Sequence, residues 1–131
     1  MGLSDSADES ARRWLDQAKY DLDTAKSLLE AGRFVYVLFC CQQAVEKALK
    51  SRIITVSKRV PPRTHNLTAL LKAAAVELDG AGTNFVRELS AYYMQTRYPD
   101  VVELPSEVAR ASAENVLERT EELLRWLPSV P

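Results

Sequence analysis

Apolar residues recur along most of this chain with the three-and-four spacing that is typical of amphipathic helices. In the first long segment, one helical stripe consists of Leu15, Ala18, Leu22, Ala25 and Leu29. Ser6 and Glu9 have the spacing of a capping box, so we expect this helix to begin near residue 7. Gly32 follows the last stripe residue and has the character of a C-terminal cap, which predicts that the helix ends there.

The next segment, from about Phe34 to Thr55, is the most apolar part of the chain. One stripe consists of Val37, Cys41, Ala44 and Ala48, and beside it lie Leu38, Val45 and Leu49. Because apolar residues cover more than half of the circumference at its start, this helix is predicted to be central. Pro61 and Pro62 cannot continue a helix, so residues 57–64 are predicted to form a loop.

Three further helices are predicted in the second half of the chain. One starts near Asn66, a good N-cap residue, and is broken by the Gly-rich residues 79–82. Another runs from about Thr83 to Gln95, and the last starts near Pro105 and is stopped by Pro128. Short connections between neighbours predict an all-α, up-and-down bundle of about five helices. The whole chain, residues 1–131, is expected to form one domain with its core between about residues 7 and 127.

The total charge is only −1, but the charged residues are distributed unevenly along the chain. Residues 47–76 hold 7 basic and no acidic side chains, whereas residues 1–46 have a net charge of −3 and residues 77–131 of −5. We call the seven the basic block: Lys47, Lys50, Arg52, Lys58, Arg59, Arg63 and Lys72. Clustered cations attract phosphates, although such a block is as typical of a solvated face that pairs with acidic helices or an acidic partner.

The sequence offers little support for a metal site, a disulfide or a known catalytic motif. The chain has one histidine, His65, and two adjacent cysteines, Cys40 and Cys41, which predicts buried or half-buried free thiols and no metal centre or cofactor. No Gly-rich phosphate loop, G-x-S-x-G or H-E-x-x-H motif is present. With no apolar run of about 18 residues and no secretory signal, we expect a cytoplasmic protein without a membrane segment.

Four motifs occur in one order along residues 12–127. Their members are Trp14-Leu15-x-x-Ala18-x-x-Asp21-Leu22-x-x-Ala25, then Gln43 to Lys50, then Arg63-Thr64-His65-Asn66-Leu67, then Tyr93 to Asp100 with its Thr-Arg-Tyr-Pro-Asp core. In this combination the sequence resembles the HEPN domain, the helical "higher eukaryotes and prokaryotes nucleotide-binding" domain. The resemblance implies a helical bundle that often forms homodimers and is frequently encoded beside a small nucleotidyltransferase, as two parts of one system.

Some members of this family are toxins, metal-independent ribonucleases with an Arg-x(4–6)-His motif at a dimer interface. Arg59 and His65 have a fitting spacing, with five residues between them, but a Pro-Pro loop separates them. In the toxins the motif lies later in the domain. One toxin group has a tyrosine after the histidine that is absent here, and no histidine follows Arg97. These departures favour a binding module over a ribonuclease, for which the candidate catalytic residues would be His65 with Arg59 or Arg97.

The expected function is therefore a nucleotide- or RNA-phosphate-binding module that acts with a nucleotidyltransferase. Its candidate contacts are Lys47, Lys50, Arg59, Arg63, His65 and Arg97, with Tyr93 or Tyr98 as surfaces on which a base would stack. Two alternatives stay open at this point: the ribonuclease, and a purely structural partner of the transferase that binds no nucleotide.

Overall fold

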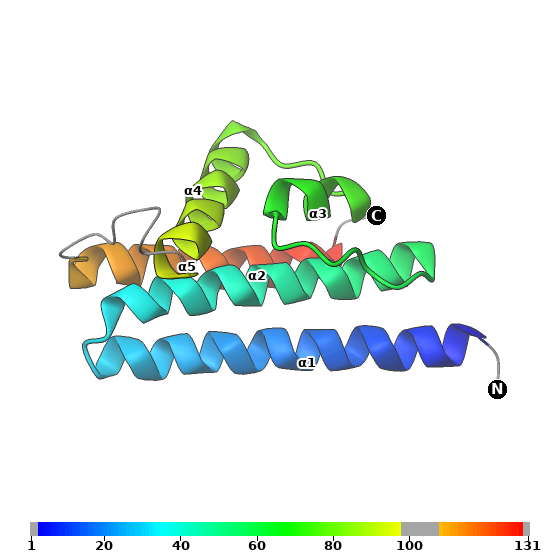
Figure 1. Ribbon diagram of the computed structural model, residues 1–131, viewed down its shortest axis with the longest axis horizontal. Coiled ribbons are helices and arrows are strands. Elements are labelled where there is room, and N and C mark those ends of the chain that lie inside the picture. Colours follow the sequence, from blue (N-terminus) through cyan, green and yellow to red (C-terminus); the bar gives the residue numbers. More distant parts are fainter. Residues whose placement is uncertain (1–2, 98–107, 130–131) are drawn as a thin grey trace.

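The computed structural model describes residues 3–97 and 108–129, and within these ranges it contains five α-helices and no strand (Figure 1). The all-α prediction is therefore confirmed. The helices are α1 (Leu3–Glu30), α2 (Phe34–Ser57), α3 (Leu67–Ala73), α4 (Gly80–Arg97) and α5 (Arg110–Trp126), and a 3₁₀ turn, η1 (Leu127–Ser129), follows α5.

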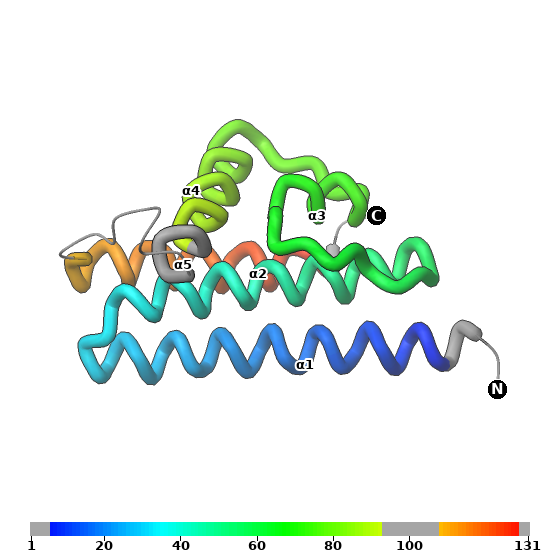
Figure 2. Tube along the Cα trace, in the orientation of Figure 1, coloured from blue at the N-terminus to red at the C-terminus, as the bar shows by residue number. Residues whose placement is uncertain are grey.

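Helix α2 is the centre of the molecule, as predicted from the apolar residues that cover more than half of its circumference at its start. It packs against each of α1, α3, α4 and α5. Helices α1 and α2 form a long antiparallel hairpin, α5 lies along α2 in the same direction as α2, and α3 covers the C-terminal half of α2 (Figure 1). Helix α4 is inclined to the others, and the tube in Figure 2 shows how it returns the chain from α3 toward α5. None of the helices that the structure describes is long and apolar enough to cross a membrane.

The hairpin packs closely because small residues of α1 face α2. Ala11, Ala18 and Ala25 are seven residues apart and almost completely buried. The larger members of the predicted stripe, Leu15 and Leu22, are only half-buried. The alanines bring the two helices together, and the leucines at the edge of α1 keep part of their apolar surface in contact with solvent.

Two predicted helix ends are confirmed in detail. Gly32 has a positive φ of 77°, and a Schellman motif closes α1 through bonds from Gly32 N to Leu29 O (3.1 Å) and from Arg33 N to Leu28 O (2.9 Å). At the start of α3, the Asn66 side-chain oxygen accepts a hydrogen bond from Ala69 N at 3.1 Å.

Other predicted boundaries are wrong. Helix α1 begins at Leu3, so Ser6 lies inside it and is not its cap. Helix α4 already begins at Gly80, where the Asp79 carboxylate accepts a bond from Gly82 N at 2.7 Å, so these glycines belong to a helix rather than break one. Helix α5 begins at Arg110, because Ala109 is still extended, with a ψ of 149°, and the predicted start near Pro105 lies outside the described residues.

Helix α3 is also shorter than predicted, because the chain reverses at Ala75. This residue has a φ of 55°, and bonds from Ala75 N to Lys72 O and from Val76 N to Leu71 O, of 3.1 and 3.0 Å, form a second Schellman motif. The left-handed conformation costs a residue with a Cβ atom about 1 kcal/mol, whereas glycine adopts it freely.

Glycine at this position is therefore expected to stabilise the protein. Ala75→Gly should raise the free energy of unfolding by up to about 1 kcal/mol, part of which is offset by the greater freedom of glycine in the unfolded chain. Urea denaturation followed by circular dichroism measures the change. The matched control is Gly32→Ala, where a Cβ atom would meet nothing within 4 Å, so that only backbone strain acts and stability should fall. A loss of stability in Ala75→Gly would contradict the argument.

Candidate functional site

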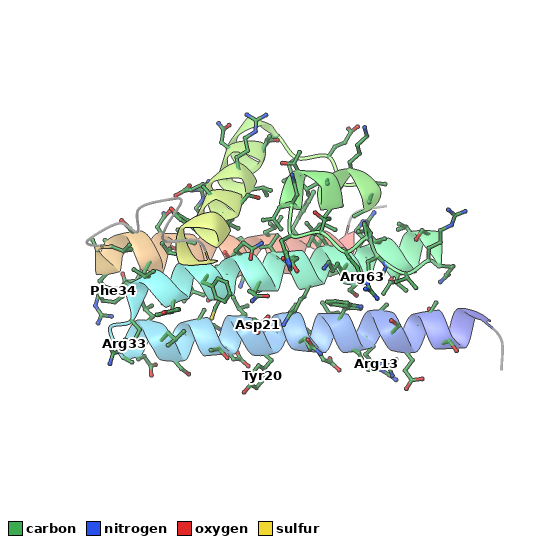
Figure 3. The ribbon with its side chains drawn as sticks, viewed as in Figure 1. Arg13, Tyr20, Asp21, Arg33, Phe34 and Arg63 are labelled. Atoms are coloured by element: carbon green, nitrogen blue, oxygen red, sulfur yellow. The ribbon has the colours of Figure 1, made fainter. Side chains whose placement is uncertain are left out.

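Lysines of the basic block on α2 and at its C-terminal end lie close to carboxylates of α1. Lys47 Nζ lies 2.8 Å from Asp21 Oδ2 of α1, and about one fifth of each side chain is exposed. Figure 3 shows Asp21 pointing from α1 toward α2, whereas its neighbour Tyr20 points away into solvent. Lys58, which caps α2 in a left-handed conformation, lies 3.5 Å from Asp8 of α1. The prediction that the basic block pairs with an acidic helix is confirmed for these two lysines.

A buried polar network surrounds Glu46, on the face of α2 next to Lys47. Lys50 Nζ lies 3.3 Å from Glu46 Oε2, and the two side chains are only 8% and 4% exposed. Glu46 Oε1 lies 2.9 Å from Nδ1 of His65, and it also accepts a bond of 3.3 Å from the amide of Gln42. We call Gln42, Glu46, Lys50 and His65 the Glu46 network.

The Glu46 network ties the loop after α2 to the helix. Glu46 contacts the ring of His65, and the Gln42 amide also donates a hydrogen bond of 3.4 Å to the backbone oxygen of His65. On its other side, the Lys50 ammonium lies 5.2 Å from the centre of the Trp14 ring, a cation–π arrangement with α1. A buried charge of this kind is tolerated because it is paired and surrounded by polarisable groups. Residues from α1, α2 and the loop are thereby held in one arrangement.

The remaining cations of the loop point outward. Arg59 and Arg63 are exposed, and among the described residues neither takes part in an ion pair. Pro61, between them, is buried, and a bond of 2.9 Å from Thr64 N to Pro62 O tightens the turn that leads to α3. Figure 3 shows Arg63 beside the C-terminal half of α2. A guanidinium that is not satisfied by the protein offers two parallel N–H donors to a phosphate.

The other members of the basic block have different roles. Arg52 donates from Nε to the backbone oxygen of Ala74 at 2.9 Å and so fixes the end of α3, and Lys72 is exposed on α3. Tyr93 and Arg97 lie on α4, but their side chains are not among those described, and Tyr98 lies outside the described residues. The structure thus brings Lys50 and His65 together through Glu46 and places Arg59, Arg63 and His65 on one loop.

Three residues of this arrangement were not candidates from the sequence: Gln42, Glu46 and Asp21. The sequence carried a signal for two of them, because Gln42, Glu46 and Lys50 recur at intervals of four on the most apolar helix and must share one face. No local pattern could show that His65, nineteen residues further on, completes the set.

The two cysteines are free, as predicted, and neither is poised for chemistry. Burial raises the pKa of the Cys41 thiol to about 12, although a hydrogen bond with Thr120 opposes the shift. Burial also raises the pKa of Cys40, and the negative charge of Asp21 adds to this effect. Both thiols are therefore protonated at neutral pH and are weak nucleophiles. Within the described residues, no three side chains of His, Cys, Asp or Glu are grouped so that they could hold a metal ion.

Comparison with known proteins gives one consistent result. The sequence model of the HEPN domain matches residues 11–130. The chain is similar to TT1696 from Thermus thermophilus, with 28% sequence identity and a TM-score of 0.77 over 91% of this chain and 96% of the other. It is also similar in fold to ST0689, described as an archaeal HEPN homologue, with 23% identity and a TM-score of 0.72 over 91% and 95% of the two chains. No curated protein matches the chain.

Proposed function

Because this chain belongs to the HEPN domain family, we propose that it is a helical module that binds the phosphates of a nucleotide or of RNA. In this proposal it acts as a homodimer beside a minimal nucleotidyltransferase, as in a toxin–antitoxin-like pair. The observation that carries the proposal is the loop between α2 and α3, which presents Arg59 and Arg63 to solvent while the Glu46 network holds the loop in place.

The proposed contacts differ in strength. Arg59 and Arg63 would supply most of the phosphate contacts, since no carboxylate among the described residues neutralises them. His65 is half-exposed beside them and is oriented by Glu46. Lys47 and Lys50 would contribute less, because Asp21 and Glu46 already offset their charges. Arg97 remains a candidate contact, as do Tyr93 and Tyr98 for base stacking.

Charge reversal on the loop tests the proposal. Arg59→Glu/Arg63→Glu is expected to weaken the binding of ATP or of a single-stranded RNA oligonucleotide by about tenfold or more, and wild-type binding is expected to weaken as salt rises. Fluorescence polarisation of labelled ligands at two salt concentrations measures both effects. The matched control is Arg12→Glu/Arg33→Glu, which changes the net charge equally at two exposed arginines outside the basic block.

The binding measurements distinguish the proposal from its structural alternative. Equal affinity of the wild type and the loop variant would contradict the proposal. If calorimetry finds that the wild type binds neither ATP, GTP nor RNA yet binds its transferase tightly, the protein is a structural partner.

A ribonuclease is the second candidate, and the bond between Glu46 and His65 favours it. A carboxylate 2.9 Å from Nδ1 fixes the tautomer and orientation of an imidazole, as in enzymes that use histidine as a general base. If the protein cleaves RNA without a metal, His65→Ala should abolish cleavage. Cleavage that persists in this variant, measured on a labelled RNA in the presence of EDTA, would exclude His65 as the catalytic base.

A further inference from the structure

An apolar groove runs between α1 and α5, along a different edge of α1 from the one that faces the Glu46 network. It consists of two hollows of about 400 and 370 Å³. Leu15 of α1, Leu124 of α5 and Pro128 line both hollows, so the two form one continuous groove. The groove exists because α1 and α5 both pack on α2 and contact each other much less extensively.

The lining of the groove keeps apolar surface exposed to water. Leu15, Leu22 and Leu124 are each only half-buried. Val56, which lines the groove from the last turn of α2, is 47% exposed. Contiguous apolar surface of this kind on a folded domain is typical of a site where another molecule binds.

The rim of the groove is positively charged in a protein whose net charge is −1. Four basic side chains and one acidic side chain line it: Lys19, Lys26, Arg52, Arg125 and Glu121. Glu121 already lies between two of these cations, 3.9 Å from Lys26 and 3.7 Å from Arg125. Two copies of this face would therefore bring like charges together, whereas an acidic partner would complement it.

The geometry points to a helical occupant. Leu15, Lys19, Leu22 and Lys26 follow one edge of α1 at intervals of four and three, over twelve residues or about 16 Å. A groove between two helices that is about three turns long accommodates a third helix, whose side-chain ridges pack between theirs. We propose that this groove binds an amphipathic helix of a partner protein, with its apolar stripe on Leu15, Leu22 and Leu124 and acidic residues against Lys19 and Arg125.

This interface is separate from the proposed phosphate site. Trp14 and Asp21 face the lysines of α2, and they precede Leu15 and Leu22 by one residue each. Successive residues of a helix point about 100° apart, so the groove and the Glu46 network lie on different edges of α1. Both can be occupied at once, and the proposal does not depend on phosphate binding.

Photo-crosslinking identifies the occupant of the groove. Val56→benzoylphenylalanine in the full chain, irradiated in the cells that make the protein, is expected to crosslink to a segment with apolar residues at helical spacing and at least two acidic residues. The matched control is the same replacement at Val60, which is 88% exposed on the loop outside the groove. Equal crosslinking at both positions, no crosslinking at Val56, or crosslinks only to a second copy of this chain or to a segment without acidic residues would overturn the proposal.

The charge requirement is tested with a synthetic peptide of the crosslinked segment. Lys19→Glu/Arg125→Glu should bind the peptide at least about tenfold more weakly than the wild type does, because attraction at the rim becomes repulsion. Arg12→Glu/Lys72→Glu makes the same change at exposed residues outside the groove and should bind as the wild type does. All four residues are exposed, so both variants should fold, which circular dichroism verifies. Equal affinities of the three proteins would refute the acidic character of the partner.

Discussion

Glu46→Ala is expected to lower the free energy of unfolding by about 3–5 kcal/mol, the usual cost of removing one partner from a buried ion pair. Lys50 would keep a side chain that is only 8% exposed and lose the carboxylate 3.3 Å from its ammonium. His65 and the amide of Gln42 would lose the same acceptor. The loss does not arise from helix propensity, because alanine is the best helix former.

Urea denaturation of three variants separates the causes. Glu118→Ala makes the same replacement at an exposed position of α5 and should change stability by less than about 0.5 kcal/mol. Glu46→Gln keeps an acceptor for His65 but not the charge, so its stability should lie between those of the wild type and Glu46→Ala. Glu46→Leu/Lys50→Met removes both charges and should recover much of the lost stability, because a paired charge replaced by apolar groups of similar size costs little. A Glu46→Ala protein within about 1 kcal/mol of the wild type would contradict this account of the network.

Helices and their order were predictable because the apolar residues repeat with a helical period over several turns. The position of α2 at the centre followed from the width of its apolar surface, and the end of α1 followed from Gly32. The resemblance of four short motifs to the HEPN domain is confirmed by the match over residues 11–130. These features are local in the sequence or depend on several motifs that occur in a fixed order.

Helix boundaries were less predictable where the signal was ambiguous. Asp79 followed by glycines is typical of a turn, but here the carboxylate caps α4 and the glycines form its first turn. Ala75 adopts a left-handed conformation that its residue type disfavours, so no sequence rule placed the end of α3 there. In the first case a local side-chain cap decides the boundary, and in the second a pair of local backbone hydrogen bonds holds a residue that disfavours its conformation.

The candidate site was predictable as a region but not residue by residue. Counting charge located the basic block, yet Lys47 and Asp21 are 26 residues apart, and their pairing depends on the register of the α1–α2 hairpin. The same register brings Trp14 to Lys50. Which cations remain available for a ligand is therefore a property of the packed helices, and Arg59 and Arg63 are distinguished from the lysines only by the structure.

That packing depends most on the apolar residues of α2. Leu49 is the residue of α2 where we expect a truncation to cost most stability. The side chain is completely buried on the helix that contacts each of the other four. Leu49→Ala is expected to lower the free energy of unfolding by about 3–4 kcal/mol, because it loses the transfer free energy of the removed atoms and leaves a cavity. Because Leu49 lies on the helix that packs against the other four, the cavity can collapse only if several helices move, which keeps the cost above the lower end of the usual range.

The matched comparison is Leu124→Ala, where the same atoms are removed from a half-buried side chain at the groove and water can enter the space. This variant should lose only about 1–2 kcal/mol. Urea denaturation of both proteins tests the difference. If the slope of the free energy of unfolding against urea concentration is unchanged, the native and unfolded states have kept their compactness. If the two variants lost equal stability, the complete burial of Leu49 would not account for the cost of removing its side chain.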